Sequence, residues 1–172
     1  MIVLDTSAFL AGFNPFSVGE DQVTTPKVEE EIRSNSLIQM RFRTAAESGR
    51  LQVREPSEEC LEIVEASAIK VGDAFYLSET DKQVLAIAIE AKRSNGNPQI
   101  VTDDYSIQNV ATNLGIAFAP LAAFGIRRLL EWVRYCPACY REYSADCESA
   151  ECTVCGTELR RKPRKKLKTL KM

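Results

Sequence analysis

The side chains of this sequence best suited to chemistry are carboxylates that recur along its first 104 residues. Asp5 and the pair Asp103 and Asp104 each follow a short apolar run, Asp81 begins a helical pattern, and Glu31 ends a run of three glutamates. Carboxylates gathered in one place repel one another, and a hard divalent cation such as Mg²⁺ or Mn²⁺ removes that repulsion. Because such a cation polarises a phosphodiester and lowers the pKa of a bound water, these acids predict metal-dependent phosphodiester hydrolysis.

Each acid also has an ordinary structural interpretation. Asp81 could complement the dipole of the helix that it begins, and Asp103 or Asp104 could cap the helix that follows them. Two of the three glutamates at 29–31 are expected to be solvated. Asp5 is the exception, because a carboxylate at the end of a buried central strand has few structural reasons to be there.

Four cysteines form a second group with metal-binding potential. They make two C-x₂-C pairs, Cys136 with Cys139 and Cys152 with Cys155, separated by twelve residues. This spacing predicts a zinc ribbon. A segment this short buries little core, so the zinc ion would supply most of its folding free energy.

Three residues bear on alternatives to the zinc site. A rubredoxin-like iron site uses similar knuckles, and Tyr140 weakens that interpretation because it stands where such a knuckle usually has glycine. Cys147, between the two pairs, is either a free thiol or a substitute ligand. Cys60 fits a helical pattern and is expected in the core.

The sequence of 172 residues contains no histidine. This excludes Ser-His-Asp and Cys-His nucleophile systems, histidine general bases and histidine-ligated zinc. No run of 18 apolar residues occurs and the N-terminal stretch lacks a basic region, so we expect neither a membrane span nor a signal peptide, and a cytoplasmic protein.

Short apolar runs alternate with helical patterns, and these elements must position the acids. Strands are expected at Ile2–Leu4, Leu51–Val53, Gln99–Val101 and Ile116–Phe118, and helices at 27–34, 37–47, 57–71, about 106–113 and from Thr80, as N-cap with Gln83 in a capping box, to Asn95. The alternation predicts an α/β fold, a Rossmann-like parallel sheet with helices on both faces. Sites in such sheets form at the carboxyl ends of the strands.

Charge is distributed unevenly along the chain. Eight of the 22 Lys and Arg residues lie between Arg160 and Met172, which leaves 14 basic against 24 acidic residues in 1–159, a net charge of −10. A basic end on an acidic body indicates a polyanionic partner, although a solvated end without a partner is the plainer alternative. The expected phosphate contacts are Arg160, Arg161, Lys162, Arg164, Lys165 and Lys166.

The acidic motifs resemble those of the PIN nuclease domain. They are I-V-L-D-T-S at 2–7, T-P-K-V-E-E-E-I at 25–32, S-E-T-D-K-Q-V-L at 78–85 and I-V-T-D-D at 100–104. The resemblance implies a Rossmann-like sheet whose acids bind Mg²⁺ or Mn²⁺ and cut single-stranded RNA. Its catalytic positions fall on Asp5, on Glu31 rather than the adjacent Glu30, on Asp81, and on Asp104 rather than Asp103.

The zinc ribbon narrows the resemblance to the PIN endonucleases that mature the 3′ end of small-subunit ribosomal RNA. It implies cleavage of single-stranded precursor rRNA on a pre-ribosomal particle, with the ribbon and basic end gripping adjacent RNA. A toxin-type PIN ribonuclease, an RNA-binding assembly factor with an inert nuclease site, and an electron carrier remain alternatives. The expected divisions are a nuclease domain over 1–125, a connecting helix over 126–134 within a helical pattern from Leu121 to Arg134, a zinc ribbon over 135–160 and a basic tail over 161–172.

Overall fold

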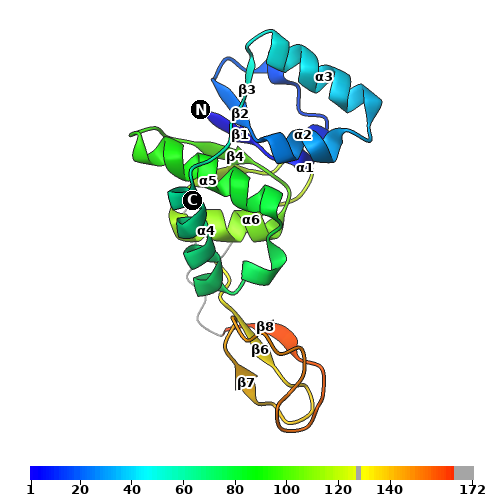
Figure 1. Ribbon diagram of the computed structural model, residues 1–172, viewed down its shortest axis with the longest axis vertical. Coiled ribbons are helices and arrows are strands. Elements are labelled where there is room, and N and C mark those ends of the chain that lie inside the picture. Colours follow the sequence, from blue (N-terminus) through cyan, green and yellow to red (C-terminus); the bar gives the residue numbers. More distant parts are fainter. Residues whose placement is uncertain (127–128, 165–172) are drawn as a thin grey trace.

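The structure is a computed structural model that describes residues 1–126 and 129–164, and these form an α/β unit followed by a small β unit (Figure 1). The α/β unit contains β1 (Ile2–Leu4), α1 (Thr6–Leu10), the 3-10 turn η1 (Pro15–Ser17), β2 (Gln22–Thr24), α2 (Pro26–Ile32), α3 (Ser36–Glu47), β3 (Leu51–Val53), α4 (Glu58–Val71), the 3-10 turn η2 (Ala74–Tyr76), α5 (Glu79–Arg93), β4 (Gln99–Val101), α6 (Tyr105–Leu114) and β5 (Ala117–Ala119). The β unit contains β6 (Trp132–Tyr135), β7 (Glu142–Tyr143) and β8 (Arg160–Pro163).

The five strands of the α/β unit are all parallel, in the order β3-β2-β1-β4-β5. The chain moves outward from β1 to β3 and then crosses back to β4 on the other side of β1. The strand order therefore reverses between β1 and β4, and the crevice at the carboxyl ends of two such strands is where open α/β sheets bind ligands. The predicted fold class is confirmed, and Leu4 pairs with Val101 at this edge.

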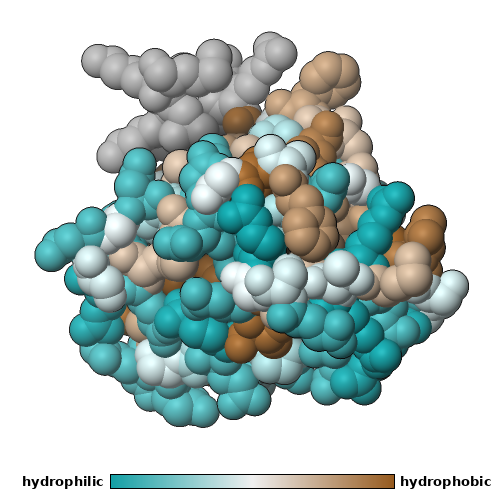
Figure 2. Space-filling model, turned by 90° about the horizontal axis from the view of Figure 1, so that it is seen from above, coloured by the Kyte–Doolittle hydropathy of each residue, from teal (hydrophilic) through white to brown (hydrophobic). Residues whose placement is uncertain are grey.

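The core of this unit is built mainly by α5, on which every residue from Val84 to Ile89 is buried. A helix buried all round belongs inside a layered domain rather than on its surface. Figure 1 shows α4, α5 and α6 grouped towards β4, and α3 at the end of the sheet nearest β3. Seen from the α3 end, the surface is mostly hydrophilic, with hydrophobic residues in small separate patches (Figure 2).

Strand β2 and helix α1 are absent from the sequence prediction. In β2, Gln22 and Thr24 are buried polar residues: Gln22 Nε2 donates to the Pro15 carbonyl at 2.8 Å and Thr24 Oγ1 donates to the Leu4 carbonyl at 2.7 Å, while Gln22 Oε1 has no partner among the described residues. Such a strand shows little apolar signal. Helix α1 is only five residues long, too short to show a period.

The predicted start of the helix that carries Asp81 is wrong by two residues. The N-cap is Ser78, not Thr80, and the capping box is closed by Asp81 rather than Gln83: Asp81 N–H donates to Ser78 Oγ at 3.2 Å, and Ser78 N–H donates to Asp81 Oδ2 at 2.7 Å. Thr80 is buried, so its side chain packs inward instead of capping.

The predicted helix between Leu121 and Arg134 is also wrong. Among the described residues of this stretch none is helical, and Trp132 to Arg134 belong to β6. Two interactions favour the non-helical path: the Asp103 carboxylate takes the N–H groups of residues 121–123, and Gly125 adopts a left-handed conformation with φ of 67°.

The β unit is an antiparallel sheet in the order β7-β6-β8 that contacts the α/β unit at the end of α4. Gly72 ends α4 with φ of 81°, and a Cβ placed there would lie 2.6 Å from the Trp132 carbonyl oxygen. Glycine is required here both by the left-handed conformation and by the close approach of β6. In the described part of the chain no helix is both long and apolar enough to span a bilayer.

Candidate functional site

Asp5 lies at the carboxyl end of β1 and is only 3% exposed. Its Oδ2 accepts hydrogen bonds from Ser7 Oγ at 2.7 Å and Thr102 Oγ1 at 2.8 Å, and its Oδ1 accepts one from Thr6 N–H at 2.7 Å. Burial raises the pKa of Asp5, and these hydrogen bonds oppose that rise. The carboxylate is therefore held in one orientation at the strand crevice.

Asp81 lies in the first turn of α5 and is half-buried. Its pKa is raised to about 6, mainly by burial and also by the negative charges of Asp5 and Asp104, against the hydrogen bonds from Ser78. Asp5 and Asp104 thus both act on Asp81 although the three carboxylates come from three separate segments. Asp81 also has a structural role that was not predicted, because its Oδ2 accepts from Ser78 N–H and closes the capping box of α5.

The structure separates the roles of the adjacent residues Asp103 and Asp104. Asp104 is the exposed N-cap of α6, and its Oδ1 accepts from Ser106 N–H at 2.6 Å and Ile107 N–H at 3.1 Å. The Asp103 carboxylate instead accepts the N–H groups of Leu121, Ala122 and Ala123 at 2.9–3.0 Å through Oδ1, which lowers the pKa of Asp103. The charge of Asp104 contributes to the raised pKa of Asp81, whereas the Asp103 carboxylate is bound by the backbone of residues 121–123.

Glu31 is connected to the same region through α1. Its Oε2 accepts a hydrogen bond from Thr6 Oγ1, and Thr6 N–H binds Asp5. Glu30 is exposed, and no such bond to the strand crevice is found for it among the described residues. The structure therefore brings Glu31 beside Asp5, whereas Glu29 and Glu30 stay on α2 without that connection.

The acids are less tightly gathered than the cysteines. Over residues 1–126 and 129–164, the one group of potential ligands whose atoms all lie within 4.8 Å of one another is the cysteine group. Mg²⁺ commonly keeps several waters and takes one or two protein carboxylates directly, so this looser set fits such a cation. Burial and, to a lesser extent, the charges of Asp5 and Asp104 raise the pKa of Asp81, and a bound cation would oppose both effects.

The β unit gathers Cys136, Cys139, Cys152 and Cys155 into one cluster. The Sγ atoms of Cys136 and Cys155 are 3.4 Å apart, and those of Cys139 and Cys152 are 3.5 Å apart. Four thiols converging in this way match the donor set of a structural zinc ion.

Both knuckles have the same backbone design. Tyr140 N–H donates to Cys136 O, and Gly156 N–H donates to Cys152 O, each at 2.9 Å. Tyr140 and Gly156 both have positive φ, 58° and 70°. The first knuckle therefore adopts the left-handed turn even without glycine. Cys147 lies outside the four-thiol cluster and packs against its small core.

The basic residues near the C-terminus divide into two kinds. Lys165 and Lys166 lie outside the described residues. Arg160 and Arg164 are exposed on or beside β8, whereas Arg161 donates to Asp73 Oδ1 at 3.1 Å and stacks on Tyr76. Lys162 pairs with Glu142 at 2.7 Å. The predicted basic tail over 161–172 therefore begins too early, because β8 extends to Pro163, and the contacts of Arg161 place it at the junction of the two units.

Sequence reasoning missed the hydroxyl groups that hold the acids. Ser7 Oγ donates to Asp5 and accepts from Asp103 N–H at 2.9 Å, and Thr102 Oγ1 donates to Asp5 and accepts from Asp104 N–H at 3.0 Å. The signal was available, because hydroxyl residues directly follow the first acid and precede the last pair.

Comparisons with known proteins agree with this geometry. Residues 2–91 match the family described as the PIN domain of ribonuclease. The chain is 39% identical over 160 residues to Endoribonuclease Nob1 of Methanothermobacter thermautotrophicus, covering 93% of this chain and 91% of the relative. It is 34% identical to Endoribonuclease Nob1 of Pyrococcus abyssi, covering 95% and 94%, and 35% identical to Ribonuclease VapC1 of Thermoplasma acidophilum, covering 92% and 76%.

Proposed function

The chain belongs to the PIN-domain ribonucleases, with Nob1 endoribonucleases as relatives over nearly its whole length, and from that membership we propose that it cuts precursor rRNA at the 3′ end of small-subunit rRNA. Its activity is that of an endoribonuclease. The rRNA substrate and the association with a pre-ribosomal particle are the proposed steps.

The observation that carries the proposal is the position of Asp5. It follows the central strand at the reversal of strand order, where its charge and that of Asp104 both act on Asp81, and Glu31 is linked to it through Thr6. These four acids would hold Mg²⁺ or Mn²⁺. When bound, that cation would polarise the scissile phosphodiester and lower the pKa of the attacking water.

Hydroxyl side chains fix the orientation of the Asp5 carboxylate. Thr102 and Ser7 hold the Asp5 carboxylate, and their other hydrogen bonds fix the backbone at residues 103 and 104. A site held in this way needs little reorganisation when an RNA strand arrives. With no histidine in the chain, proton transfer falls to these carboxylates and to solvent.

The β unit carries groups that would contact the RNA away from the cleaved bond. Four cysteines would bind one structural zinc ion, and Arg160 and Arg164 are exposed at β8, directly before further lysines of the sequence. Cations in this position add affinity for phosphates without reading the base sequence. We therefore infer that the ribbon and the basic end hold rRNA next to the cleavage site.

The test is cleavage of an RNA that spans the mature 3′ end of small-subunit rRNA, in Mn²⁺, by the wild type and by Asp5→Asn. A shuffled RNA of equal length is the substrate control. We expect wild type alone to cut, at the mature end of the natural sequence. If neither protein cuts but both bind, the proposal that the isolated protein cuts this RNA fails, in favour of an RNA-binding assembly factor or a nuclease that requires the assembled particle.

Asp103 and Asp104 provide a matched pair for the same assay. Asp104→Asn removes an acid that acts on Asp81 while keeping a residue suited to the N-cap of α6, so cleavage should fall at least about 100-fold. Asp103→Asn changes a carboxylate that binds the 121–123 backbone and should retain more activity. Equal losses of cleavage activity in the two variants would contradict the choice of Asp104 over Asp103 as the last catalytic acid.

A further inference from the structure

The segment from Leu121 to Ile126 is fixed next to the acids by two side chains of the nuclease domain. Asp103 accepts the N–H groups of Leu121, Ala122 and Ala123. Gln108, which is fully buried, accepts Ile126 N–H at 2.8 Å and donates to Thr102 O at 3.0 Å. The segment is thus held on both sides of Phe124, by residues that also contact the Thr102–Asp104 edge of the site.

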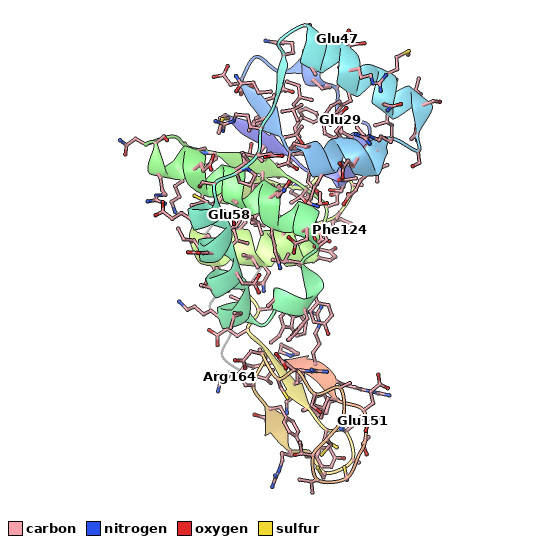
Figure 3. The ribbon with its side chains drawn as sticks, viewed as in Figure 1. Glu29, Glu47, Glu58, Phe124, Glu151 and Arg164 are labelled. Atoms are coloured by element: carbon pink, nitrogen blue, oxygen red, sulfur yellow. The ribbon has the colours of Figure 1, made fainter. Side chains whose placement is uncertain are left out.

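Phe124 is 94% exposed, the highest exposure among the large hydrophobic side chains described. Figure 3 shows it projecting from the side of the α/β unit, near the end of the grouped helices from which α5 begins. Because the backbone on both sides of it is hydrogen-bonded to anchored side chains, the exposure is a fixed feature of the segment. Folding gains almost nothing from this ring, since an exposed Phe buries little apolar area.

The segment is close to the acids through a short chain of hydrogen bonds. Ala123 N–H, adjacent to Phe124, binds the Asp103 carboxylate; Asp103 N–H binds Ser7 Oγ, and Ser7 Oγ binds Asp5. A second aromatic side chain, Tyr105, follows Asp104 at the start of α6 and is 55% exposed. One exposed ring therefore follows Asp104 directly, and the other lies in the segment that binds the Asp103 carboxylate.

We propose that Phe124 stacks on an unpaired base of the RNA substrate and so positions the strand across the acids, with Tyr105 as a second stacking surface. This inference rests on the proposed function, and it specifies how single-stranded RNA is held. Bases of single strands stack on aromatic side chains whatever their identity. Bases in a duplex are stacked on each other, so this contact favours single strands.

The experiment measures binding of short single-stranded RNAs that each carry one 2-aminopurine, in the presence of Mn²⁺. Asp5→Asn serves as the parent protein, so that the RNA stays intact. We expect quenching of the 2-aminopurine at one position near the cleavage site. Phe124→Ala and Phe124→Leu should abolish this quenching and raise the Kd about 5-fold to 100-fold, while Phe124→Tyr should keep both. Because the side chain is exposed, none of these variants is expected to unfold.

Phe16→Ala is the matched control. Phe16 is 49% exposed, and it lies in η1, whose Pro15 carbonyl binds Gln22 at the start of β2, the opposite edge of the sheet from the acids. This variant should bind and quench like the parent. If Phe124→Ala and Phe124→Leu also bind and quench like the parent while wild type cuts RNA, the stacking inference is overturned alone. A wild type that neither cuts nor binds the RNA would overturn the proposed function and the stacking together.

Discussion

Arg161, on the last strand of the β unit, donates a hydrogen bond to the carboxylate of Asp73, which directly follows α4 in the nuclease domain. Asp73 is 1% exposed and also accepts from Asn109 Nδ2 at 2.6 Å, while Asn109 binds both the N–H and the carbonyl of Leu130. The Arg161 guanidinium lies 3.7 Å from the ring centroid of Tyr76 and 4.2 Å from that of Trp132. One buried carboxylate thus joins the two units and the segment between them.

Replacing Arg161 by alanine should destabilise the protein in a pH-dependent way. Burial raises the pKa of Asp73, and Asn109 and Arg161 oppose that rise. The folded protein therefore binds this proton more tightly than the unfolded chain, so the free energy of unfolding falls as pH rises from about 4 through the folded pKa. Without Arg161 the pKa of Asp73 rises further, and the fall should become larger and reach higher pH.

Urea unfolding of wild type and Arg161→Ala between pH 4 and 8 measures this effect, and we expect a loss of about 2–3 kcal/mol at pH 7. Asp73→Asn is the control. It removes the titrating group, so residue 73 should no longer contribute to the change of the free energy of unfolding with pH. Parallel pH curves for wild type and Arg161→Ala would show that the ion pair does not contribute.

Glu31 and Glu30 should differ in their importance for cleavage. Glu31→Gln weakens the acid linked to Thr6 beside Asp5, and we expect a loss of about 10–100-fold in cleavage rate. Glu30→Gln changes an exposed neighbour on the same helix and should be close to wild type. The measurement is single-turnover cleavage in Mn²⁺, and the opposite ranking would move the second catalytic position to Glu30.

Substitution of a clustered cysteine and of the cysteine outside the cluster should have different effects on the zinc content of the protein. We expect one zinc ion per chain in wild type and in Cys147→Ser, and loss of that ion in Cys139→Ser, because Cys139 belongs to the four-thiol cluster and Cys147 does not. Elemental analysis of purified protein measures the ratio. Helical circular dichroism should survive in Cys139→Ser, since all described helices lie in the α/β unit. A red, iron-containing protein would contradict the zinc assignment.

Gly72→Ala should cost more stability than Gly115→Ala. Both glycines have positive φ, 81° and 64°, so each substitution carries the left-handed cost of about 1–2 kcal/mol. At Gly72 the new Cβ would also lie 2.6 Å from the Trp132 carbonyl oxygen, whereas at Gly115 it would meet only the flexible end of Lys92. Thermal unfolding of the two variants compares them. Equal melting temperatures would mean that β6 moves away from α4 at little cost.

The sequence was sufficient to predict the helices and strands that have a clear apolar pattern. It was insufficient where polar contacts determine the path of the backbone. The apolar runs predicted β1, β3 and β4, and the glycine after α4 marked its end. By contrast, β2 is buried without forming an apolar run, because Gln22 and Thr24 are polar and bond to carbonyls of the main chain. Residues 121–134 have helical spacing, yet the Asp103 carboxylate and the pairing of β6 with β8 hold their described part in another conformation.

The residues of the candidate site were likewise predictable only in part. Strand ends and helix starts identified the acids, because parallel topology brings those positions together. The choice of Asp104 over Asp103 came first from the resemblance to PIN nucleases, and the structure supports it because the Asp103 carboxylate is occupied by residues 121–123. The role of Arg161 was not predictable from charge, since its partner Asp73 lies 88 positions away in the chain.

The pairing of β1 with β4 also sets the moment at which the enzyme can first act. Asp5 is among the first residues made on the ribosome, but Asp104 is made about a hundred residues later. At about 5–20 residues per second, that interval is on the order of 5–20 s. Until β4 is available to pair with β1, the growing chain holds an incomplete set of acids. If the four acids act as proposed, a nuclease synthesised in direct contact with RNA would gain its activity only once its parallel sheet is assembled.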